Sequence, residues 1–164
     1  MEQAALGSPN WSVVRARPLL VLSLRSPGGE NTWMDTWRDL TALVFSCGLA
    51  TRETQAVEVR YDVGTSQRFD ACLSIRPLHT AAEVSADDLA RVPGVRMETV
   101  MGSGPYLHRG PGHGHPAPAA AHAPALVPAW PRYHVYGCSP ALAGDSLTIT
   151  DTYITLAAAV PARR

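Results

Sequence analysis

A histidine and a tyrosine near the C-terminal end of the chain are the residues best suited to chemistry. In residues 131–136 (PRYHVY) the side-chain types alternate as they do in a β-strand. The alternation places Arg132, His134 and Tyr136 on one face of that strand. An imidazole titrates near neutral pH, and a phenol can donate a hydrogen bond. We therefore expect this face to line a ligand site in which His134 is an acid, a base or a hydrogen-bond donor.

Other aromatic side chains are candidates for the walls of such a site. Trp33 and Trp37 lie one turn apart in a predicted helix, where indoles either anchor a core or hold a flat apolar ligand. Asp151 shares a face of the last strand with Tyr153 and could orient His134 or Tyr136. The further candidates for ligand contact are Tyr61, His108, Trp130 and Tyr153, and for each of them ordinary core packing is an equal alternative.

The composition excludes several classes of function. The 164 residues carry no net charge, their 14 basic residues are all arginine, and they form no basic stripe, so we expect no nucleic-acid partner. No apolar run approaches the ~20 residues of a membrane helix, and the N-terminus does not resemble a signal peptide. We expect a cytoplasmic monomer or homodimer that does not contact membranes. The residue bias is typical of a high-GC genome such as that of an actinomycete.

The sequence predicts neither a metal nor a cofactor. The histidines at 108, 113, 115 and 122 fall in a segment rich in Gly, Pro and Ala without regular ligand spacing, so exposed loop side chains are expected there. There is no phosphate-binding or dinucleotide motif. Cys47, Cys72 and Cys138 are far apart in apolar surroundings, which favours three buried free thiols.

Hydrophobic periodicity predicts an α+β fold in which strand, helix, strand and strand occur twice. The first half has a strand over 18–26, a helix from Asn31 or Thr32 that ends before Gly48, and a hairpin with one core face. The second half has a helical turn at 85–89, strands at 94–101, 133–138 and 147–156, loops at 106–116 and 139–145, and a short helix at 119–123 that Pro118, Pro124 and Pro128 confine. We expect two pseudo-equivalent βαββ repeats (17–77 and 92–160) in one domain over 17–160, with helices on one face of an antiparallel sheet. Residues 1–16 are predicted to be a tail or strand extension, and 161–164 a tail.

Four segments in this order resemble the GyrI-like superfamily of effector-binding domains. They are the hairpin 57–75 (VEVRYDVGTSQRFDACLSI), the turn 102–111 (GSGPYLHRGP), the strand 133–140 (YHVYGCSP) and the closing strand 150–160. The resemblance implies two βαββ repeats with a ligand cleft between them. It also implies cleft positions for Tyr106, His134 and Tyr136. One departure stands out, because the family's pocket glutamate, two residues before the tyrosine, is His134 here.

The resemblance implies a small-molecule ligand, and three roles are open. The first is a cofactor-free enzyme of secondary metabolism that hydrolyses a strained ring or cyclises a polyketide-like molecule, with His134 as acid or base and Tyr106 and Tyr136 as donors to a carbonyl. The second is a non-catalytic protein that binds a drug or antibiotic for resistance or sensing. The third, a protein-interaction module of the gyrase-inhibitor type, predicts a polar cleft, and the aromatic residues argue against it. No DNA-binding module is expected in residues 1–16, so a stand-alone role is implied.

Overall fold

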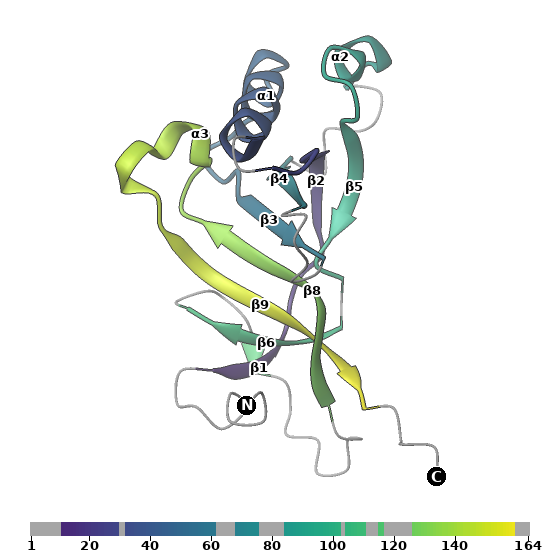
Figure 1. Cartoon of the computed structure of the whole chain (residues 1–164), viewed down its shortest axis with the longest axis vertical. Coiled ribbons are helices and arrows are strands. Elements are labelled where there is room, and N and C mark those ends of the chain that lie inside the picture. The colour runs from purple at the N-terminus through teal and green to yellow at the C-terminus, as the bar shows by residue number, and fades with distance from the viewer. Residues whose placement is uncertain are drawn as a thin grey trace.

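The computed structural model describes residues 11–29, 32–61, 68–75, 84–102, 104–110, 115–116 and 126–159. In Figure 1 the described helices gather at one end of a long sheet. The elements are β1 (Ser12–Arg15), β2 (Leu19–Arg25), α1 (Thr32–Ser46), β3 (Ala56–Arg60), β4 (Phe69–Ser74), α2 (Ala86–Ala90), β5 (Arg96–Val100), β6 (Pro105–Arg109), β7 (His115–Pro116), β8 (Leu126–Tyr136), α3 (Pro140–Ala143), a 3₁₀ turn (Gly144–Ser146) and β9 (Ile149–Ala158).

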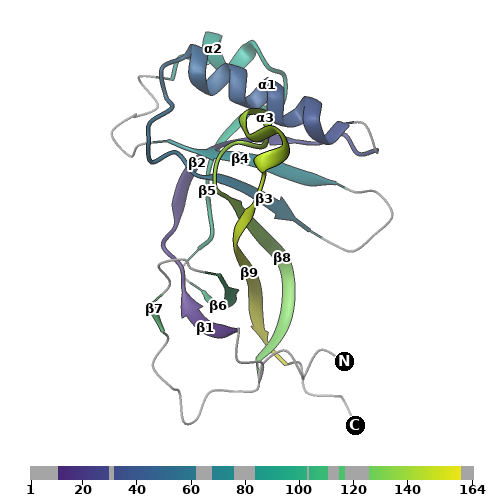
Figure 2. The same cartoon turned by 90° about the vertical axis from the view of Figure 1, so that its left-hand side faces the viewer.

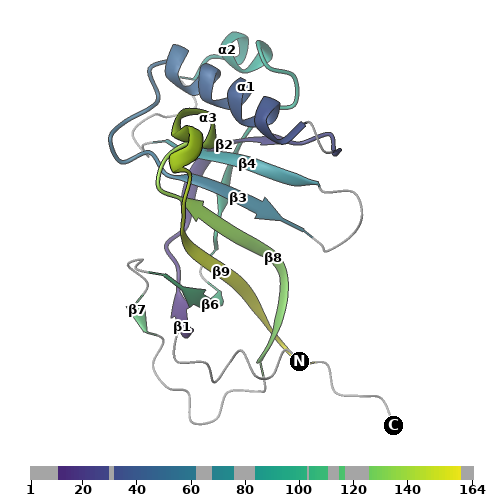
Figure 3. The ribbon, with the colours of Figure 1, turned by 60° about the vertical axis from the view of Figure 1, so that its left-hand side comes forward.

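The described strands form one antiparallel sheet in the order β5-β2-β4-β3-β8-β9-β6-β1-β7. Its middle is the junction of β3 and β8, where Glu58 lies opposite His134 and Val57 opposite Val135. Outward from this junction, β4 and β2 follow on one side, and β9 and β6 on the other. Figures 2 and 3 show the helices on one face of the sheet, and β8 and β9 run away from them as long bent ribbons. The α+β class with an antiparallel sheet is confirmed.

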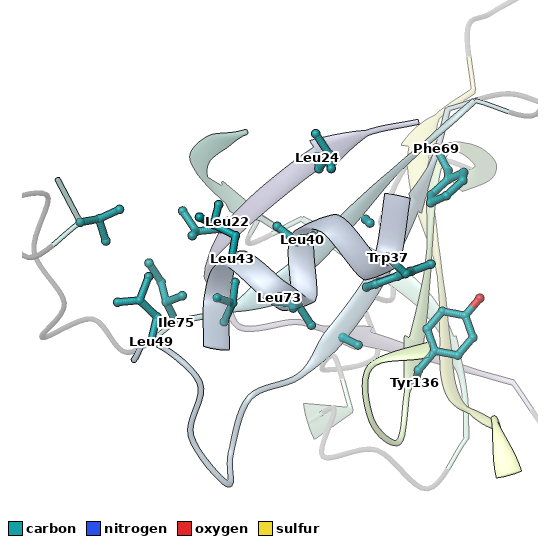
Figure 4. Packing of buried hydrophobic residues seen from close by; sticks show 14 residues of the cluster. Leu22, Leu24, Trp37, Leu40, Leu43, Leu49, Phe69, Leu73, Ile75 and Tyr136 are labelled. Carbon is teal, nitrogen blue, oxygen red and sulfur yellow. The ribbon is translucent and has the colours of Figure 1, made fainter. Parts of the chain in front are cut away.

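Helix α1 forms where the sequence predicts it and covers the sheet with its apolar side. Trp37, Leu40 and Val44 recur at helical spacing and are fully buried against β2 and β4. Gly48 follows the helix with a φ of +67°, the left-handed conformation that a C′ glycine adopts readily. Figure 4 shows Trp37 between the helix and Tyr136, so this indole joins the helix to β8. We call this side of the sheet the helix face.

The opposite side of the sheet, the far face, is also buried. Val21, Val57, Cys72, Tyr133 and Tyr153 belong to a second apolar cluster there. Strands β3 and β4 are therefore buried on both faces, and the expectation of a hairpin with a single core face is wrong. The reason is tertiary: α1 covers one face, while the bend of the sheet brings β1 and β6 over the other (Figure 3).

The second half of the chain differs from the prediction at three places. Residues 105–109 form β6 rather than a loop, and residues 140–143 form a short helix capped by Ser139 rather than a loop. Strand β8 begins at Leu126, seven residues before the predicted strand, because its pairing with β9 continues across a bulge between Ala129 and Arg132. The predicted helix at 119–123 lies outside the described residues, and the repeat and the cleft between its halves stay predictions.

The three cysteines are free thiols, although they do not share one environment. Cys72 is buried, Cys47 is half-buried and Cys138 is exposed, so the expectation of three buried thiols is wrong for Cys138. Burial raises the pKa of the Cys72 thiol well above its ordinary value. Within the described ranges, no helix is both long and apolar enough to cross a bilayer.

Candidate ligand-binding face

A buried carboxylate lies at the centre of the sheet on the helix face. Glu58 of β3 is fully buried, and its carboxylate accepts three hydrogen bonds. Trp33 Nε1 donates to Oε2 at 2.7 Å, and Tyr136 Oη donates to the same oxygen at 3.1 Å. Arg60 Nε donates to Oε1 at 2.5 Å in an ion pair. Burying a charge in this way is stable only because the donors replace water.

Three aromatic rings surround this carboxylate. Trp33 and Trp37 of α1 and Tyr136 of β8 contact one another edge to face, with ring centroids 5.9 to 6.4 Å apart. Burial raises the pKa of the Tyr136 phenol, and the negative charge of Glu58 raises it further. The phenol is therefore a hydrogen-bond donor over the whole physiological range, and its partner is Glu58.

The two predicted tryptophans have different environments. Trp37 is fully buried, and its indole N–H has no hydrogen-bond partner within the described part of the chain. Trp33 is half-buried, and its indole N–H donates a hydrogen bond to Glu58. Of the pair, the ring of Trp33 is the one that a ligand on this face can reach.

His134 is the neighbour of Glu58 on the other side of the strand junction. The two residues are paired across β3 and β8, and His134 Nδ1 lies 4.0 Å from Glu58 Oε1. Burial lowers the pKa of His134 from its ordinary value; the charge of Glu58 opposes this effect, and the charges of Arg60 and Arg132 add to it. The imidazole is neutral at pH 7, and its side chain is 26% exposed. It can therefore accept a proton from a bound molecule.

Two arginines continue the same face. Arg60 of β3 lies directly opposite Arg132 of β8. The guanidinium of Arg132 lies over the ring of Trp130, with its Cζ 4.3 Å from the ring centroid. Trp130, a predicted ligand contact, therefore lies next to the row of Arg132, His134 and Tyr136.

Four predicted site residues lie elsewhere. Tyr106 and Tyr153 are buried in the far-face cluster, where each packs edge to face against a neighbouring tyrosine. The Tyr106 hydroxyl donates to the Gly102 carbonyl oxygen at 2.8 Å. His108 stacks on Tyr153 and is hydrogen-bonded through Nε2 to Asp151 at 2.8 Å. The structure does not bring these residues together with His134, and Asp151 orients His108 instead of His134.

Tyr61, the remaining predicted contact, belongs to an ionic cluster on the far face. Its hydroxyl donates to Asp70 at 2.7 Å, and Arg25 lies over its ring. Asp70 is paired with Arg25 and Arg96. Burial disfavours the Asp70 carboxylate, but the bonds from Arg25 and Tyr61 and the charge of Arg96 outweigh it and lower its pKa.

Sequence reasoning missed Glu58 and Arg60. A hairpin with one core face would place both on its solvent side, where charged residues need no explanation. The sequence carries no signal for their burial, because Val57, Glu58 and Val59 alternate as they do in a strand with one solvated face. No group of three metal-ligating side chains is present among the residues that the structure describes.

Comparisons with solved structures place the fold. The C-terminal domain of EcmrR superposes with a TM-score of 0.58 at 10% identity, over 91% of this chain and 98% of that domain. A hydrolase from Listeria innocua superposes with a TM-score of 0.51 at 11% identity, over 95% of this chain and 96% of its own. Both likenesses support a GyrI-like fold. At these identities the likeness is one of fold alone. No protein-family model matches the sequence, and no curated protein does.

Proposed function

We propose that this protein binds a flat, hydrophobic, polycyclic or polyketide-like small molecule on the helix face and transforms it without a cofactor. The observation that carries the proposal is the pair of a fully buried Glu58 carboxylate and a half-buried His134, 4.0 Å apart at the centre of the sheet. The predicted cleft between two repeats belongs at this junction of β3 and β8. Secondary metabolism in the cytoplasm is part of the proposal.

The chemistry follows from the neutral imidazole. A carboxylate beside Nδ1 favours the tautomer that carries its proton there, which leaves Nε2 as the acceptor. His134 would remove a proton from water during hydrolysis of a strained ring, or from an acidic carbon during cyclisation. Glu58 would stabilise the imidazolium that forms. Trp33 and Trp130 would hold the apolar rings, and orientation would supply the rest of the rate enhancement.

One observation favours the alternative, a non-catalytic protein that binds a drug or antibiotic. Tyr136, predicted as a donor to a substrate carbonyl, already donates its hydroxyl proton to Glu58. Tyr106, the other predicted donor, bonds the Gly102 carbonyl on the far face. His134 is then the one predicted catalytic group left to act on a ligand, and a face with a single such group can also retain its ligand unchanged.

Incubation with a panel of aromatic polyketides and cyclopropane-containing natural products, followed by mass spectrometry, tests the proposal. We expect one compound class to be retained and converted. His134→Ala and His134→Gln should both abolish conversion, because glutamine keeps a hydrogen bond but cannot carry a proton. Leu142→Ala, an exposed side chain on α3, is the control and should leave conversion unchanged. Retention without conversion would establish the alternative, and full conversion by both His134 variants would remove His134 from the mechanism.

A further inference from the structure

A histidine and an aspartate are buried together on the far face, away from the proposed site. His108 of β6 and Asp151 of β9 are 5% and 8% exposed, and His108 Nε2 lies 2.8 Å from Asp151 Oδ1. In the neutral imidazole Nε2 therefore carries the hydrogen that the carboxylate accepts, and Nδ1 carries the lone pair. The ring is held in place by Tyr153, on which it stacks with a centroid distance of 4.6 Å. The pair is an oriented base.

The acceptor nitrogen of this base is not used by the fold. Within the described part of the chain, the hydrogen bond that His108 makes through its side chain is the one from Nε2 to Asp151. Nδ1 is not among the sealed, unpartnered polar atoms of the described side chains. It is therefore open to a further group, and a lone pair in this position can accept a proton from a neighbouring hydroxyl.

The neighbouring strand supplies a hydroxyl. Strands β9, β6 and β1 are adjacent in the sheet, and His108 is directly opposite Tyr153 on one side and Ser12 on the other. Directly paired residues share a face, with Cβ atoms about 4.5–5.5 Å apart. Asp151 lies two residues before Tyr153 and so belongs to the same face. A hydroxyl, an imidazole and a carboxylate thus follow one another across three strands.

The two nitrogens of His108 match their neighbours. Nδ1 is the nitrogen nearer to the backbone, where the short side chain of a directly paired serine ends. Nε2 is at the tip of the ring, where the diagonal neighbour Asp151 reaches it. The hydroxyl of Ser12 can turn among three staggered positions and so come within reach of Nδ1. Ser12 is exposed, which leaves it open to a substrate from solvent. The order of nucleophile, base and orienting carboxylate is that of a Ser-His-Asp triad.

We propose that Ser12 is a nucleophile toward esters, with His108 as its base and Asp151 as the positioning residue. The hydroxyl proton passes to Nδ1 while Oγ forms a bond to the carbonyl carbon. The ester C–O bond then breaks, the alcohol leaves with that proton, and the acyl group stays on Ser12. Water, deprotonated by the same nitrogen, releases the acid and restores the serine. This site shares no residue with the helix face and does not depend on the proposed function.

The next residues on the same face indicate the acyl group. Val14 of β1 is directly opposite Tyr106 of β6, one pair further along from Ser12 and His108 on this face. Both side chains are buried in the apolar far-face cluster. A short apolar acyl chain on Ser12 would extend that cluster, so esters of small uncharged acids are the substrate class.

A fluorophosphonate probe, which phosphonylates activated serines, tests the nucleophile. We expect one equivalent of label, which peptide mass spectrometry should place on Ser12. Ser12→Ala should abolish labelling, and His108→Gln should slow it at least about a hundredfold, because a general base supplies about that factor. Ser46→Ala changes an exposed serine at the end of α1 and should leave the rate unchanged.

Hydrolysis of p-nitrophenyl butyrate tests the positioning role of Asp151. We expect a burst of nitrophenolate equal to the protein concentration, followed by slower turnover. Asp151→Asn should lower kcat about tenfold or more and leave KM unchanged, since Asp151 acts on the base and not on the ester. Titration with the fluorophosphonate gives kcat per reactive serine. A carboxylate that only stabilised the fold would reduce the number of reactive sites and leave this kcat as it is.

A third variant does not require any change to the buried pair. An imidazole beside a thiol stabilises the thiolate, so Ser12→Cys should react quickly with iodoacetamide at pH 7. The exposed Cys138 is the internal reference, and we expect the introduced thiol to react at least about tenfold faster. Circular dichroism checks the fold of His108→Gln, and the thiol measurement decides if that variant is not folded.

Three results would overturn the proposal. They are label that is absent or spread over several serines, labelling of Ser12 that a folded His108→Gln does not slow, and an introduced thiol that reacts no faster than Cys138. In each case His108 and Asp151 would only brace β6 against β9. None of these results bears on the helix face, whose test is the conversion of its ligand by His134.

Discussion

At the scale of single residues, a buried carboxylate lies beside His134, although not at the position that the GyrI-like resemblance implies. The GyrI-like motif predicts a glutamate two residues before Tyr136, and this chain has His134 there. The structure places Glu58 directly opposite His134 on the neighbouring strand, where it accepts a hydrogen bond from the Tyr136 hydroxyl. The sheet centre thus pairs a buried carboxylate with a neutral imidazole.

Replacing Glu58 by glutamine tests this arrangement. The negative charge of Glu58 raises the pKa of His134 against the effects of burial and of Arg60 and Arg132. Glu58→Gln should therefore lower the pKa of His134 further, as measured by NMR titration of the imidazole. It should also reduce the free energy of unfolding by about 2–4 kcal/mol, because an amide N–H would face the donors that now bond a carboxylate.

The matched control is Glu53→Gln, an exposed position before β3. It should change stability by less than about 0.5 kcal/mol and leave the imidazole titration in place. A pKa of His134 that stays constant or rises in Glu58→Gln would contradict the assignment of the carboxylate–imidazole pair. For the wild type, the lowered pKa of His134 means that its contribution to stability is complete above about pH 6.5 and is lost as the pH falls toward the lowered value.

The same residues show how far sequence reasoning reaches. Period-two alternation correctly places Arg132, His134 and Tyr136 on one face, because a strand has only two faces. It cannot say which distant strand pairs with that face, and so Glu58 and Arg60 were missed. The family resemblance grouped Tyr106 with His134, and aromatic character added His108 and Tyr153, although the pairing of β6 with β9 places all three on the far face.

At the scale of elements, the sequence predicts those elements that are determined by residues close together in the chain. Helix α1 and its final Gly48 follow from apolar spacing and a C′ glycine within the same 17 residues. The sequence did not predict strand β6, because residues 105–109 lie between glycines and begin with a proline, which is typical of a loop. Their strand conformation comes from hydrogen bonds to two distant strands. Strand β1 lies about 95 residues earlier in the chain, and β9 lies about 45 residues later.

The junction after β6 depends on one glycine. Gly110 has a φ of +130°, and a Cβ there would lie 2.2 Å from the Thr150 carbonyl oxygen of the adjoining β9 segment. Gly110→Ala should lower the free energy of unfolding by about 3 kcal/mol, because both the backbone conformation and the close approach exclude a side chain. Urea denaturation measures the change.

Gly102→Ala is the matched control for that substitution. Nothing lies within 4 Å of a Cβ at Gly102, and its φ is outside the left-handed region. Its effect should stay within about 0.5 kcal/mol. Equal stabilities for the two variants would show that β6 and β9 do not meet as the structure has them.

At the scale of the whole molecule, the two faces of the sheet carry different clusters of charged side chains. The helix face carries Glu58, His134 and the two arginines, where charge and apolar rings meet. The far face carries an ionic cluster that ties four strands together. Asp70 of β4 receives two bonds from Arg25 of β2, one from Arg96 of β5 and one from Tyr61 at the end of β3. This cluster stabilises the half of the sheet on which α1 lies.

Acid stability should therefore depend on Asp70. Its folded-state pKa is lowered, so its contribution is complete above the unfolded value of about 3.9 and is lost as the pH falls through the lowered value. Asp70→Asn should cost about 2 kcal/mol at pH 7, less than for a fully buried pair because both arginines are half exposed. The loss should shrink as the pH falls from about 4 toward the lowered pKa, because the unfolded wild type takes up a proton in this range while the folded wild type still carries the carboxylate charge. Asp35→Asn, which breaks an exposed pair on α1, should change stability by less than about 0.5 kcal/mol at any pH. Urea denaturation at pH 7, 4 and 3 measures both variants. A constant difference between Asp70→Asn and wild type over this range would mean that the carboxylate charge does not hold the four strands together.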